Sequence, residues 1–121
     1  MSNHSSVTIS ATLAAELAQG TIDDINKHRQ NSKDKVVKRR LESLNNGFFH
    51  KLFRSQDYTY EQVWKAEEAE PLDHWGNEFW SIDHMLYGEQ MTVAERVLHA
   101  SKLGTDVTLS IRDYERISYW K

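Results

Sequence analysis

The sequence predicts a mostly helical α+β fold with four or five helices and a short C-terminal strand pair or hairpin, which an N-terminal strand can join. Three observations predict this class. Apolar residues recur at helical spacing through most of the chain, the segments 59–62 and 92–95 match the helix capping box, and apolar residues alternate with polar ones at residues 107–111. The chain has 121 residues and no cysteine, so its core must hold together by packing rather than by disulfides.

The N-terminal elements are predicted as follows. Residues 7–9 read as a short strand or an extended lead-in, and Ser10 or Thr12 begins a short helix that Gly20 ends. A second helix extends from Thr21 to about residue 44, before Asn-Asn-Gly. Because residues 26–35 include no apolar side chain, this segment is either one projecting helix or two shorter helices with a loose joint.

The elements after residue 47 follow from the same signals. Helices are predicted at residues 48–53, from the capping box at 59–62 to about 70, at 75–88, and from the capping box at 92–95 to 104. Residues 107–111 read as a half-buried strand, with a turn at 112–115 and a second strand at 117–119. The tetrapeptides at 7–10 and 107–110 are similar, which suggests that they are partner strands.

Charge and aromatic residues divide the chain into two parts. Residues 1–54 have nine Lys and Arg against five Asp and Glu, whereas residues 55–121 have six against thirteen. All thirteen aromatic residues lie at or after Phe48. Because aromatic side chains dominate core energetics, we expect a basic helical arm at 1–47 and a compact acidic, aromatic-rich core at 48–121.

Several function classes lack their motifs. Without cysteine there is no thiolate metal site, and the chain has no phosphate-binding glycine loop and no nucleophile elbow. We therefore predict no enzyme activity and no cofactor. The sequence shows no signal peptide and no membrane-spanning stretch, so we expect a cytoplasmic protein with no membrane association.

Tryptophan marks the predicted partner-binding surface. Trp75 and Trp80 are five residues apart and diverge by about 140° on a helix, so one of them faces away from the core. Trp120 lies next to the C-terminal residue, where full burial is difficult. The predicted partner-binding residues are Trp75, Glu78, Trp80, Asp83 and Trp120. They favour a small protein-interaction module, an adaptor or inhibitor, and an acidic face of this kind can also imitate nucleic acid. A short, acidic chain without cysteine and without a metabolic motif resembles the accessory proteins of phages and other mobile elements.

Two alternatives remain. In the first, the basic arm binds nucleic acid beside a winged-helix-like core, through Lys33, Lys38, Arg39 and Arg40. The same cations fit two other interpretations: a solvated helix face, or a contact with the acidic half, within one chain or in a homodimer.

In the second alternative, His74, Glu78 and His84 bind a metal ion in a metal-dependent enzyme. The competing interpretation places the His84 ring on Trp80, one helical turn earlier. The acidic run Glu67, Glu68 and Glu70 is expected to be a solvated helix end.

Overall fold

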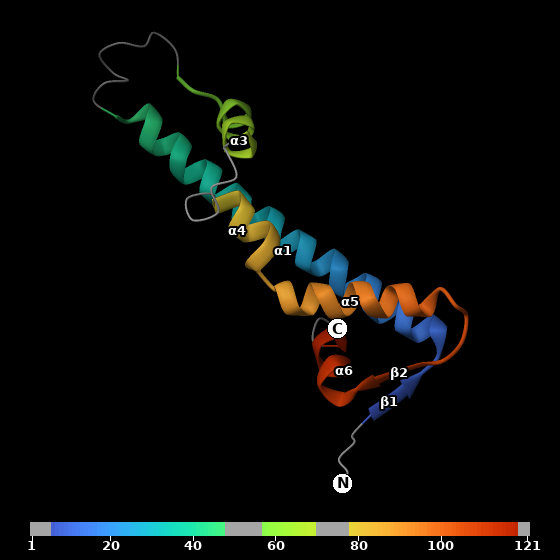
Figure 1. The fold of residues 1–121 in the computed structure, drawn as a ribbon. Coiled ribbons are helices and arrows are strands. Elements are labelled where there is room, and N and C mark those ends of the chain that lie inside the picture. The colour runs from blue at the N-terminus through green and yellow to red at the C-terminus, as the bar shows by residue number, and fades with distance from the viewer. Residues whose placement is uncertain (1–5, 48–56, 70–77, 119–121) are drawn as a thin grey trace. The chain divides into compact units, whose positions relative to one another are not determined.

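The computed structural model describes residues 6–47, 57–69 and 78–118 (Figure 1). These residues form five helices and a two-stranded sheet, which confirms the mostly helical α+β class. The elements are β1 (Ser6–Ile9), α1 (Ala11–Asn45), α3 (Tyr60–Glu68), α4 (Glu78–Met85), α5 (Gly88–Ser101), β2 (Val107–Ser110) and α6 (Ile111–Ser118). None of the helices in these ranges is both long enough and apolar enough to cross a bilayer.

The sheet joins the two similar tetrapeptides, as the sequence suggested. Strands β1 and β2 pair antiparallel, with Val7 opposite Leu109 and Ile9 opposite Val107. The predicted hairpin within residues 107–119 is wrong, because Ile111–Ser118 form helix α6. The Ser110 hydroxyl accepts a hydrogen bond from the backbone N–H of Asp113 at 3.0 Å, which caps this helix where a turn was expected.

Helix α1 is one continuous helix, so the predicted stop at Gly20 is wrong. Gly20 does not have the positive φ that a left-handed helix end requires. It is therefore an ordinary helical residue.

Two further helix ends differ from the prediction. Tyr87 adopts the left-handed conformation, with φ of 57°, and helix α5 begins at Gly88, where the preceding helix was expected to close. The Thr92 hydroxyl donates to the carbonyl of Gly88 at 2.9 Å instead of capping a new helix. The capping box of α3 is confirmed by reciprocal hydrogen bonds between Thr59 and Gln62.

The chain divides into two compact units, and α1 contributes to both. The terminal unit comprises Met1–Lys27 and Tyr87–Lys121, and the central unit comprises His28–Leu86. The predicted division of the chain between residues 47 and 48 stays a prediction. The predicted short helix at 48–53 lies outside the described residues.

The terminal unit has an apolar core built from helices α1, α5 and α6 and both strands. Its fully buried members include Ala14, Ala94 and Ile117. The Thr21 hydroxyl, itself buried, donates to the carbonyl of Ile117 at 2.7 Å, which ties α1 to α6. Residues of the basic arm therefore help to build a core that the aromatic distribution had placed after residue 47.

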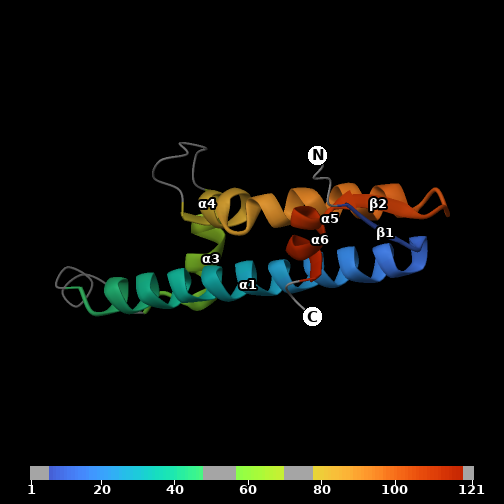
Figure 2. The same cartoon turned by 90° about the horizontal axis from the view of Figure 1, so that it is seen from below.

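The central unit has a smaller core, in which α3 and α4 pack beside the C-terminal half of α1 (Figure 2). Its buried apolar residues are Val36, Val37, Val63 and Phe79. Leu41, Tyr58, Trp64 and Ile82 are partly buried against them. Polar contacts also join the helices of this unit, as the ion pairs described below show.

Candidate interaction surface

Four cations of the basic arm pair with carboxylates inside the central unit. Three of these contacts connect α1 to another helix. The nitrogen–oxygen distances are 2.7 Å for Lys33 with Asp83, 2.7 Å for Arg39 with Glu78, 2.8 Å for Arg40 with Glu67 and 3.0 Å for Lys38 with Asp34. All four residues of the predicted nucleic-acid site are therefore engaged with carboxylates of the same chain. For Lys33, Arg39 and Arg40 this arrangement corresponds to the interpretation in which the basic arm contacts the acidic half, whereas the Lys38–Asp34 pair lies within the arm itself.

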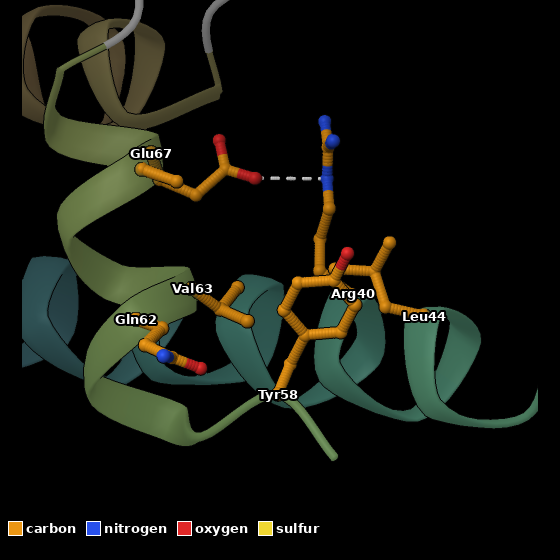
Figure 3. Close-up of a pocket in the computed structure, with 7 residues that line it drawn as sticks. Arg40, Leu44, Tyr58, Gln62, Val63 and Glu67 are labelled. Atoms are coloured by element: carbon orange, nitrogen blue, oxygen red, sulfur yellow. Dashed lines mark ion pairs between the residues drawn. The ribbon is translucent and has the colours of Figure 1, made fainter. Parts of the chain in front are cut away.

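Glu67 is the most buried of these carboxylates, so the expectation that it lies in a solvated helix end is wrong. The residue is 3% exposed, and its Oε1 accepts from Arg40 Nε (Figure 3). The run of three glutamates gave no hint of this, because the partner lies on α1, far away in sequence. The spacing of Val63 and Glu67, one helical turn apart, was the available signal that both lie on the packed side of α3.

Lys33 also lies partly inside the central unit. Its side chain is 16% exposed, and its ammonium group lies 5.2 Å from the centroid of the Phe79 ring, a cation–π distance. It pairs with Asp83, whose side chain is 44% exposed. Lys33 therefore joins α1 to α4 by charge and by ring contact.

Asp34 links α1 to the first residue of α3. Its Oδ1 accepts a 2.6 Å hydrogen bond from the Tyr60 hydroxyl, and its Oδ2 lies 3.0 Å from the Lys38 ammonium. These two contacts hold the pKa of Asp34 below its usual value, and the hydrogen bond from Tyr60 has the larger effect. The same hydrogen bond, which the neighbouring carboxylate accepts, raises the pKa of Tyr60.

The predicted partner-binding residues do not form one exposed acidic patch in the described part of the chain. Trp75 and Trp120 lie outside the described residues. Glu78 and Asp83 are bound by cations of α1. Trp80 remains, half-buried on α4.

The Trp80 ring stacks on the ring of His84, with centroids 4.7 Å apart and planes inclined by 17°. This confirms the interpretation that His84 packs on Trp80. His84 Nδ1 also lies 2.9 Å from the Trp80 carbonyl oxygen.

The side of α4 opposite Phe79 carries a second group of side chains. We define the α4 face as Trp80, Ser81, His84 and Met85. These four positions fall on one broad side of the helix at 100° per residue, and the buried Phe79 points the other way. Met85 is 69% exposed, so the face includes a long apolar side chain that is open to solvent. Met85 was not among the predicted partner-binding residues, although it directly follows His84 in the sequence.

A pocket of about 330 Å³ lies between α1 and α3, within the central unit (Figure 3). It is lined by Arg40, Leu44, Tyr58, Gln62, Val63, Ala66 and Glu67. Leu44 is 41% exposed at its edge. The pocket combines apolar walls with the Arg40–Glu67 ion pair, and its size is at the lower end of small-ligand sites.

The metal alternative finds little geometric support in the described residues. They contain no group of three or more His, Cys, Asp or Glu side chains placed to hold an ion. The Glu78 carboxylate is bound by Arg39 through both oxygens, at 2.7 and 2.9 Å, and the His84 ring is stacked on Trp80. His74 lies outside the described residues.

In the described residues the winged-helix-like arrangement has no hairpin wing, since Val107–Ser110 form β2 but Ile111–Ser118, which were to supply the turn and begin the second strand, form α6. Comparison of the chain with models of known protein families, with curated proteins and with solved structures found no match.

Proposed function

We propose that this protein is a protein-interaction module, an adaptor or inhibitor, that binds its partner through the α4 face. The observation that carries the proposal is the 69% exposure of Met85 on the same face of α4 as the half-buried Trp80 and the exposed His84, whose rings stack. Tryptophan is enriched at binding hot spots, and methionine adapts its shape to a partner surface. The face therefore combines a rigid aromatic contact with an adaptable apolar one.

The rest of α4 supports this role by fixing the helix in place. Phe79 anchors it in the central core, while Glu78 and Asp83 hold it to α1 through ion pairs. A binding surface on a fixed helix loses less conformational entropy when a partner binds. Because those two carboxylates are occupied, the α4 face recognises its partner through aromatic and thioether contacts more than through negative charge.

The experiment uses a photo-crosslinking amino acid at position 85, in cells that naturally contain the protein. The matched control carries the same amino acid at position 103, because Leu103 is 79% exposed and belongs to the terminal unit. We expect one partner to crosslink at position 85 and not at position 103. Adding Trp80→Ala should abolish that crosslink without changing the circular dichroism spectrum, and Trp80→Phe should retain part of it.

Two results would contradict the proposal. One is crosslinking of the same partner with equal yield at both positions, which indicates nonspecific apolar contact. The other is an unchanged crosslink at position 85 in a folded Trp80→Ala variant, which shows that the aromatic stack makes no contribution.

A further inference from the structure

We propose that the pocket between α1 and α3 binds a small uncharged molecule that combines a compact apolar body with a hydrogen-bond acceptor, such as a carbonyl group. The pocket has a volume of about 330 Å³ and lies within the central unit (Figure 3). It shares no described residue with the α4 face, so this proposal is independent of the proposed function.

The walls of the pocket are mainly apolar. Leu44 comes from α1, Val63 and Ala66 come from α3, and Tyr58 lies just before α3. Val63 is buried in the central core, whereas Leu44 is 41% exposed at the edge of the pocket. A ligand that covers Leu44 removes a large apolar side chain from water, which favours an apolar body.

The walls are held in place without a ligand. The Asn45 side chain accepts from the backbone N–H of Tyr58 at 2.7 Å and donates to the Tyr58 carbonyl at 3.1 Å. The capping box on Thr59 fixes the start of α3, and the ion pair of Arg40 with Glu67 ties its last turns to α1. Because the pocket is already formed, a ligand orders few side chains when it binds.

Two polar side chains of the lining retain hydrogen-bond donors. Arg40 uses Nε to contact Glu67 at 2.8 Å, and its two Nη atoms make no hydrogen bond within the described residues. Gln62 Oε1 accepts from the backbone N–H of Thr59 at 2.9 Å, which leaves Gln62 Nε2 as a donor with no partner in the same ranges. Both side chains are exposed, so we infer that the polar end of the ligand is an acceptor.

The charges of the lining favour an uncharged ligand. Among the described lining residues, Arg40 and Glu67 are the charged ones, and they pair with each other. An anion that contacts the Arg40 guanidinium would also lie near the Glu67 carboxylate, and a cation near Glu67 would be repelled by Arg40. An uncharged ligand avoids both repulsions and loses less hydration when it enters the pocket.

The test follows the amide signals of the isotope-labelled full chain by nuclear magnetic resonance. Three aromatic probes have equal numbers of non-hydrogen atoms: acetophenone has a carbonyl acceptor, indole has an N–H donor, and benzoate has a negative charge. We expect acetophenone to bind with a Kd of about 1 mM. It should shift the backbone signals of Val63 and Ala66 and the side-chain amide of Gln62, while indole and benzoate bind at least about threefold more weakly.

Two variants test the site, each with a matched control. Ala66→Leu fills the pocket, and its control is Lys65→Leu, at an exposed neighbour on α3 that is not among the described lining residues. Gln62→Glu removes the Nε2 donor and keeps an acceptor for the capping box, and its control is Gln30→Glu, at an exposed position of α1. Both pocket variants should weaken acetophenone binding at least about threefold, and both controls should bind like the wild type.

Several outcomes would overturn the proposal. Acetophenone without saturable shifts at Val63, Ala66 and Gln62 refutes the site. Indole that binds as tightly as acetophenone refutes the acceptor, and benzoate that binds more tightly refutes the uncharged ligand. Equal losses in a folded pocket variant and its control also refute the site, and Gln62→Glu retains this test if Ala66→Leu does not fold.

Discussion

The ion pair of Arg40 and Glu67 predicts unequal costs for removing its two partners. The Glu67 side chain is 4% exposed and that of Arg40 is 43% exposed. The variant Arg40→Ala leaves a buried carboxylate without this guanidinium, which is costly because a buried charge loses its hydration. The variant Glu67→Leu instead leaves a cation that water can reach.

The exposure of the two side chains sets the expected magnitudes. Removing one partner of a fully buried pair costs about 3–5 kcal/mol, and the exposure of Arg40 reduces this to about 1–3 kcal/mol for Arg40→Ala. Glu67→Leu should cost less than about 1 kcal/mol, because it also adds apolar burial. At about 4 °C per kcal/mol, Arg40→Ala should lower the Tm by about 4–12 °C.

The assay is thermal or urea unfolding followed by tryptophan fluorescence. Three of the four tryptophans lie within His28–Leu86, so the signal reports mainly on the central unit. The double variant Arg40→Ala, Glu67→Leu should be more stable than Arg40→Ala alone, since the buried carboxylate is gone. Equal costs of the two single variants, or simple addition in the double variant, would refute the reasoning.

Three further predictions concern other parts of the fold. The contacts of ionised Asp34 lower its pKa and stabilise the folded state above about pH 4. The stability advantage of the wild type over Asp34→Asn in urea unfolding should therefore vanish as the pH falls through that lowered pKa. An advantage that persists below it contradicts the assignment. Gly20→Ala should raise the free energy of unfolding by about 0.5–1 kcal/mol, because an added Cβ meets nothing within 4 Å, whereas Gly104→Ala, at φ of 78°, should lower it. Ile117→Ala should cost about 2–5 kcal/mol in urea unfolding, since Ile117 is 0% exposed in the terminal core, and a cost below this range would show that the core collapses around the cavity.

The sequence predicted those elements whose signals are local. The capping box of α3 depends on Thr59 and Gln62, three residues apart, and it formed as expected. The alternating residues of β2 were likewise readable, and their similarity to β1 identified the partner strand. Such features depend on periodicity and on neighbouring side chains, which a single sequence displays.

The errors arose where a distant contact decides the local structure. The polar centre of α1 left open one helix or two helices with a loose joint. The structure has one helix, in which Lys33 packs against Phe79 and Arg29 Nε donates to the Leu86 carbonyl at 3.0 Å. At Gly20 the local signal predicted a helix end, but the helix continues through this residue because its neighbouring turns are buried.

The candidate site was predicted only in part. The α4 helix and the stacking of His84 on Trp80 follow from spacing, whereas the pairing of Glu78 with Arg39 joins residues 39 positions apart. Opposite net charges of the two halves indicated that such pairs could form, and not which residues would form them.

The central claim is that four basic side chains of α1 are held by partners within the central unit, namely Lys33, Lys38, Arg39 and Arg40. It is tested most directly by the solvent exchange of arginine Nε–H protons in nuclear magnetic resonance spectra. Arg40 Nε–H, bound to Glu67, should exchange much more slowly than that of Arg112, which is exposed and has no ion pair among the described residues. Exchange of Arg40 at the rate of Arg112, unaffected by Glu67→Gln, would contradict the claim.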